Sequence, residues 1–137
     1  MKNKIKILIK EPYKKPYIKE VENELKTYQE IVGGYIECIG CPTCEEIDLV
    51  CNEEGKLDKL EGNFFIPEYE DCLVGTVFAV GYNDEGDFVS ITDEQAKIAS
   101  EYMEKYSLLE NENLYLDFYA ITNRINTLYK SKEIEQE

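Results

Sequence analysis

Four of the five cysteines of this chain lie close together, at a spacing that metal sites use. Their positions are Cys38, Cys41, Cys44 and Cys51. Thiolates spaced in this way bind Zn²⁺ in tetrahedral structural sites. If residues 35–39 and 47–51 pair as a hairpin, Cys38 and Cys51 lie nearly opposite each other, and all four thiols converge on one ion. The spacing therefore predicts a candidate structural zinc site.

Two features of the same cysteines argue against metal binding. A zinc ribbon normally uses two separated CxxC pairs, whereas the run CIGCPTC places three thiols in succession. An iron-sulfur run uses a different third spacing and has a proline after its last cysteine. The cysteine count is odd, and reduced thiols rather than disulfides are the usual state in the cytoplasm. We favour reduced, unligated thiols, keep a structural zinc ion as the alternative, and predict no other cofactor.

The acidic residues are a second group that could carry a function. The chain has 15 Lys and Arg against 29 Asp and Glu, which gives a net charge of -14. Residues 31–96 contain two Lys and sixteen acidic residues, so this segment accounts for the whole imbalance. The candidate partner-binding residues are Glu45, Glu46, Glu53, Glu54, Asp84, Glu85 and Asp87. A solvated face that only confers solubility is the alternative interpretation.

The charge also indicates which partners are disfavoured. A strongly negative field repels phosphate backbones and anionic lipid headgroups, because affinity for nucleic acid comes mainly from Lys and Arg. We therefore predict no direct contact with nucleic acid and no membrane binding, and expect a host protein with a basic surface as the partner. No apolar run is long enough for a membrane span, and Lys interrupts the N-terminal segment MKNKIKILIK, so we expect a cytoplasmic protein.

Several catalytic classes lack their essential residues. The chain has no His, which removes the commonest general base near neutral pH and excludes Ser-His-Asp and Cys-His sites. Neither a GxxxxGK[ST] phosphate loop nor a GxGxxG motif is present. The sequence therefore predicts a protein that is not an enzyme.

The elements that position these residues follow from hydrophobic periodicity and turn residues. The segments with strand character are 5–9, 35–39, 47–51, 76–82 and 88–91, whereas 57–71 reads as irregular. Helical spacing indicates helices around 21–32 and 93–107, the second opened by a capping box from Thr92 to Gln95. We predict an α+β fold in which these helices pack on one face of a mostly antiparallel sheet of about five strands.

The end of the chain has its own pattern. An apolar stripe from Leu114 to Leu128 predicts a C-terminal helix, followed by the charged tail KSKEIEQE. We expect residues 1–109 to form the α+β domain and residues 110–137, the helix and tail, to belong to the same unit. The helix packs either on the body of the domain or on a second copy, which makes a homodimer.

Three segments resemble a known family. They are LKTYQEIVGGYIECI, IDLVCNEEGKL and GTVFAVGYNDEGDFVSITDEQ, and the resemblance that they carry extends over roughly residues 4–105. They resemble the uncharacterised family called domain of unknown function 3846. The resemblance implies an origin in bacteriophages, plasmids or conjugative elements, without an assigned activity. The chain departs from the family pattern in its CPTC stretch and in the helix after Glu110.

Charge and resemblance together lead to a functional expectation. We expect a non-enzymatic binding protein of a phage or mobile element, in which the acidic segment contacts a basic surface. A sharper version is a nucleic-acid mimic that inhibits a host defence nuclease or DNA-binding protein. One alternative is a protein that binds a small molecule, such as a nucleotide signal, through the basic face of the first strand and Tyr side chains. Another is a zinc protein built on the cysteine cluster.

Overall fold

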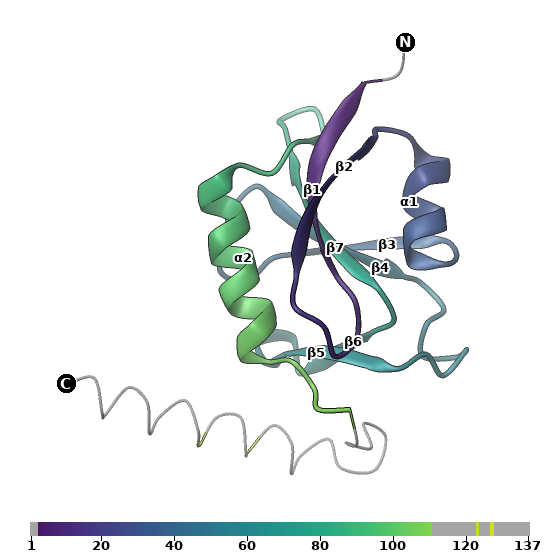
Figure 1. Ribbon diagram of the computed structural model, residues 1–137, viewed down its shortest axis with the longest axis vertical. Helices are drawn as coiled ribbons and strands as arrows, with labels where there is room; N and C mark the ends of the chain where they lie inside the picture. The colour runs from purple at the N-terminus through teal and green to yellow at the C-terminus, as the bar shows by residue number, and fades with distance from the viewer. Residues whose placement is uncertain (1–2, 111–122, 124–126, 128–137) are drawn as a thin grey trace, which may run out of the picture.

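One antiparallel sheet forms the centre of the protein, whose computed structural model describes residues 3–110 together with Asn123 and Thr127 (Figure 1). The strands of this sheet are β1 (Lys4–Lys10), β2 (Tyr17–Glu22), β3 (Ile36–Gly40), β4 (Ile47–Asn52), β7 (Val77–Tyr82) and β8 (Phe88–Val89). Their order is β2-β1-β7-β4-β3, and β8 pairs with the end of β7. The predicted α+β class with a mostly antiparallel sheet is confirmed.

Both faces of the sheet are buried, each under one helix. Helix α1 (Leu25–Val32) and helix α2 (Asp93–Lys105) lie on opposite sides of the strands in Figure 1. In β7, Phe78 and Val80 pack in the core beneath α1, while Ala79 packs in the core beneath α2. We expected both helices on one face. A central strand that is apolar at nearly every position needs cover on both sides, because both sets of its side chains must leave water.

The segment before α1 forms strand β2, whose last two residues lie within the helix predicted over 21–32. Val21 pairs with Ile5 of β1, so it belongs to the sheet. Val21 lies at helical spacing from the apolar positions of α1, which is why the sequence predicted one helical stripe. Leu25, a member of that stripe, is exposed in the structure. The helix ends at Gly33, which adopts a left-handed conformation with φ of 81° and donates its N–H to the carbonyl of Gln29, as expected for a glycine cap.

A second, two-stranded sheet occupies the segment that we expected to be irregular. It consists of β5 (Gly62–Ile66) and β6 (Asp71–Val74), with a short 3₁₀ turn at Pro67–Tyr69 between them. Every residue of β5 is buried. Asn63, which resembles a turn residue in the sequence, lies fully buried inside this hairpin because hydrogen bonds satisfy its side chain.

The capping box predicted for α2 is present. The Thr92 hydroxyl accepts from the N–H of Gln95 and the Gln95 side chain accepts from the N–H of Thr92. After α2 the chain runs along β5, where Ser107 forms a bridge with Phe64. This contact ties the end of the described segment to the second sheet.

Other predictions concern the end of the chain. The C-terminal helix and homodimer contact predicted after residue 110 lie outside the described residues. Within the described part of the chain, no helix is both long and apolar enough to span a bilayer.

Candidate functional site

Five of the seven candidate partner-binding carboxylates gather at one end of the central sheet. They belong to the β3–β4 and β7–β8 loops, which adjoin because Ile47 pairs with Gly81 and the N–H of Tyr82 donates to the carbonyl of Glu46 at 3.0 Å. All five are exposed. We call this group the acidic end, and its residues are Glu45, Glu46, Asp84, Glu85 and Asp87.

The backbone of the β7–β8 loop is held without using these carboxylates. The side-chain oxygen of Asn83 accepts from the N–H groups of Glu85 and Asp87, both at 3.0 Å. Gly86 takes the left-handed conformation that closes the turn, with φ of 83°. Within residues 3–110 none of the five carboxylates forms an ion pair. Their charge is therefore available to a partner.

The other two candidate carboxylates lie elsewhere. Glu53 and Glu54 follow the opposite end of β4, whose six residues span about 20 Å at roughly 3.3 Å per residue. The seven residues therefore do not form one continuous surface. They separate into the acidic end and a pair beside the C-terminus of α1.

The pairing of β3 with β4 separates the first and last cysteines of the predicted zinc site. The hairpin forms as expected, but Cys51 lies opposite Glu37 and Cys38 lies opposite Val50. Opposed residues share a face of the sheet and neighbours along a strand alternate. Cys51 therefore faces the core beneath α2 with Leu49, and Cys38 lies on the α1 face. A register shifted by one residue prevents the expected convergence.

The remaining cysteines of the set do not restore a metal site. Cys41 and Cys44, in the β3–β4 loop, pack against the core beneath α2. In the part of the chain that the structure describes, no three Cys, Asp or Glu side chains are close enough together to hold a metal ion. The described cysteines are free thiols.

The environment of the thiols disfavours thiolate chemistry. Burial, with smaller contributions from nearby carboxylates, raises the pKa of Cys51 and of Cys72 to about 12. Burial also raises the pKa of Cys38 and of Cys44. Since the thiolate is the nucleophile and the metal ligand, these four thiols are poorly prepared for either role at neutral pH.

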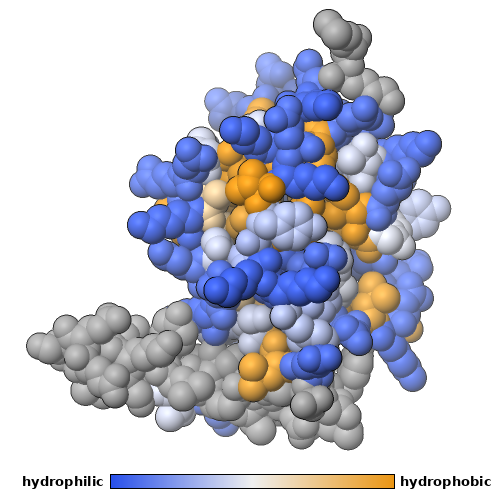
Figure 2. All heavy atoms as spheres, viewed as in Figure 1, coloured by the Kyte–Doolittle hydropathy of each residue, from blue (hydrophilic) through white to orange (hydrophobic). Residues whose placement is uncertain are grey.

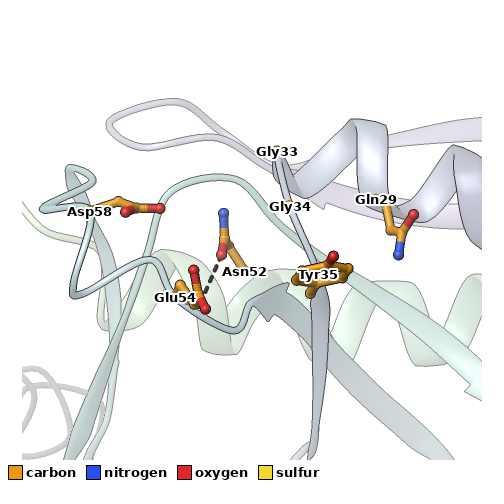
Figure 3. A pocket seen from close by; sticks show the side chains of 7 residues that line it. All are labelled: Gln29, Gly33, Gly34, Tyr35, Asn52, Glu54 and Asp58. Carbon is orange, nitrogen blue, oxygen red and sulfur yellow. Dashed lines mark hydrogen bonds between the residues drawn. The ribbon is translucent and has the colours of Figure 1, made fainter.

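A hollow of about 270 Å³ lies at the C-terminal end of α1 (Figure 3). It brings together two of the segments that carry the family resemblance, VGGYIE and NEEGK. Sequence reasoning treated their residues as independent caps and turns and did not detect their contact. The residues that line the hollow are Gln29, Gly33, Gly34, Tyr35, Asn52, Glu54 and Asp58.

Asn52 joins the two segments beside this hollow. Its side chain is nearly buried, and its Nδ2 donates to the carbonyl of Val32 at 3.3 Å while its Oδ1 accepts from the N–H of Glu54 at 2.8 Å. A Cβ on Gly34 would lie 2.9 Å from this Nδ2, so a side chain at position 34 would force the Asn52 amide to shift. The side-chain amide of Asn52 is thus occupied by hydrogen bonds within the protein. We therefore interpret the hollow as a structural joint between α1 and β4.

Comparison with known proteins is informative at the level of the family. The family model described as domain of unknown function (DUF3846) matches residues 5–107 of the 137 residues. Comparisons with curated proteins and with solved structures found no match. The match covers the central sheet, both described helices and the β5–β6 hairpin. The chain therefore belongs to the DUF3846 family.

Proposed function

We propose that the protein is a non-enzymatic binding module whose acidic end docks on a basic surface of a partner protein. The observation that carries this proposal is the gathering of five exposed carboxylates from two loops at one end of the sheet. With a net charge of -14, the whole molecule adds a long-range attraction for a basic partner. Such complementarity speeds association and selects the partner.

A sharper form of the proposal identifies the class of partner. Proteins that grip a phosphate backbone present Lys and Arg in a groove, and clustered carboxylates can take the positions of the phosphates. In this form the protein comes from a phage or mobile element and acts in the cytoplasm, where it inhibits a host defence nuclease or DNA-binding protein. Nucleic acid and this protein would then compete for one surface.

Two observations support a binding role over catalysis. The sequence has no His, so a common source of general acid and base chemistry is missing. The pKa of the Cys38, Cys44 and Cys51 thiols is raised, so these groups stay protonated at neutral pH. A binding module needs neither group.

The test compares the natural protein with two variants that have the same net charge as each other. The first converts the five carboxylates of the acidic end to amides, as Glu45→Gln, Glu46→Gln, Asp84→Asn, Glu85→Gln and Asp87→Asn. The second, the control, converts five exposed acidic residues outside the acidic end, as Glu30→Gln, Glu53→Gln, Glu54→Gln, Asp58→Asn and Glu61→Gln. Each tagged protein is incubated with lysate of a bacterial host, and bound proteins are identified by mass spectrometry.

We expect the natural protein to capture a nuclease or DNA-binding protein, and we expect double-stranded DNA and high salt each to displace it. The acidic-end variant should lose this protein, and the control should keep it. If both variants lose it equally, total charge rather than the acidic end is responsible. If DNA does not displace the captured protein, mimicry of nucleic acid is ruled out.

A further inference from the structure

Lys10 lies inside the protein, unlike the other lysines of β1. Lys4 and Lys6 are exposed, as the alternating pattern predicts, whereas Lys10 is only 1% exposed. Its Nζ donates to the carbonyl of Glu11 at 2.9 Å and to Oδ1 of Asn63 at 3.0 Å. A lysine is rarely buried to this extent unless something compensates its charge.

The surroundings of Lys10 are built to hold the amine in place. Asn63 is fully buried, and its Nδ2 donates to the carbonyl of Lys10 at 2.7 Å and to the carbonyl of Gly75 at 2.8 Å. One asparagine thus fixes both the backbone and the side chain of Lys10. Because both N–H donors of this amide and its oxygen are hydrogen-bonded, the orientation of the pair is set by the fold.

The amine still lacks a counter-charge. An ammonium group has three N–H donors, and two of them reach neutral oxygens. Among the described residues no carboxylate forms an ion pair with Lys10; Glu104 acts on it only through longer-range attraction. Burial accordingly lowers the pKa of Lys10 to about 8, and Glu104 opposes this shift. A buried cation without an anion in contact costs free energy that an anionic ligand would recover.

Lys10 lines a hollow of about 370 Å³ at the end of the first strand. Lys14 and Lys15 are exposed, and the apolar side chain of Leu108 adds to the lining. The hollow has three lysines against two glutamates, a positive balance in a strongly acidic chain. The other charged or polar side chains that line it are those of Tyr13, Glu104, Ser107 and Glu110.

We propose that this hollow binds a small molecule through an oxyanion, a phosphate or carboxylate group that accepts the remaining N–H of Lys10. Lys14 and Lys15 hold the same group from the solvent side. The buried Leu108 and the ring of Tyr13 offer apolar surface to the rest of the ligand. This oxyanion site is separate from the acidic end, because the two lie at opposite ends of β7. Lys10 pairs with Val77, and the acidic end adjoins Gly81 and Tyr82.

The experiment observes Lys10 directly by NMR. The full chain is labelled with ¹³C and ¹⁵N in its lysines, and the Cε signal of Lys10 is followed while inorganic phosphate or acetate is added at constant ionic strength. An oxyanion in contact favours the protonated amine, so the signal should move and saturate. Saturation by phosphate alone, by acetate alone or by both identifies which oxyanion the hollow prefers, and each result supports the site.

Two matched variants separate a site from general charge attraction. Lys14→Gln with Lys15→Gln should weaken the binding about tenfold, because two charge-assisted contacts are lost. Lys4→Gln with Lys6→Gln removes the same charge from the exposed part of β1 and should leave the affinity unchanged. The proposal is overturned if neither anion gives a saturable shift at concentrations that would fill a site with a Kd of about 1 mM. Equal weakening in both variants would overturn it as well.

Discussion

The amine of Lys10 is a titrating group whose protonation state is coupled to folding. Burial lowers its pKa from the ordinary value of 10.5 to about 8. In the unfolded chain Lys10 regains the ordinary value, so between pH 8 and pH 10.5 the unfolded state binds more protons than the folded state. The contribution of Lys10 to stability therefore rises with pH across this window.

A Lys10→Met variant makes this contribution measurable. The free energy of unfolding of the natural protein minus that of the variant should increase by up to about 3 kcal/mol between pH 8 and pH 10.5. Urea unfolding of both proteins at several pH values provides the two curves. The subtraction cancels the contributions of other titrating groups. Among these are Cys51 and Cys72, whose raised pKa values make stability fall with pH at high pH. Parallel curves would show that Lys10 titrates normally.

Between elements, the contact of Gly34 with Asn52 connects the end of α1 to the turn after β4. Gly34→Ala places a Cβ 2.9 Å from Nδ2 of Asn52, so the amide must move and the carbonyl of Val32 loses its donor. We expect a loss of about 2 kcal/mol in the free energy of unfolding, typical of an unsatisfied buried polar group. Once Asn52→Ala removes the amide, the same glycine substitution should cost much less.

A double-mutant cycle tests this coupling by urea unfolding. The interaction energy between Gly34→Ala and Asn52→Ala should be at least about 1 kcal/mol. Gly33→Ala is the matched control, because its Cβ meets nothing within 4 Å but its φ of 81° is left-handed. It should destabilise by about 1 kcal/mol in either background. An equal cost of Gly34→Ala in both backgrounds would show that the contact is not responsible.

Across the whole molecule, opposite ends of the central sheet differ in charge. The acidic end lies beyond the C-terminus of β7, and the hollow of Lys10 lies near its N-terminus. The view down the short axis shows mostly hydrophilic side chains over both helices, with hydrophobic residues visible between them (Figure 2). The net charge of -14 makes most of this surface self-repulsive.

Salt should therefore stabilise the protein. Raising NaCl from about 0.01 M to about 0.1 M shortens the Debye length from roughly 30 Å to roughly 10 Å, which screens repulsion between acidic residues. We expect the midpoint of thermal unfolding, measured by circular dichroism, to rise by a few degrees. The acidic-end amide variant, with its charge reduced by five, should show a smaller rise. A midpoint that does not respond to salt would mean that repulsion contributes little to stability.

Local patterns predicted much of the fold correctly. Alternation identified β1, short apolar runs bounded by turn residues identified the hairpin of β3 with β4 and the strand β7, and a capping box located the start of α2. These features depend on neighbours within a few residues, so a single chain reveals them. The strand β5 was missed because Gly62 and Asn63 are turn residues in most contexts. Burial against β6 and the segment after α2 overrides that preference.

The candidate sites divide in the same way. The sequence by itself determined the acidic charge, the lack of His and the family, since composition and motifs suffice for each. Tertiary structure alone decided that Cys38 and Cys51 lie on opposite faces, that Glu53 and Glu54 lie apart from the acidic end, and that Lys10 is buried. These outcomes depend on strand register and on which distant segments cover each face. A one-residue change in register reverses every side chain, and no local pattern encodes that choice.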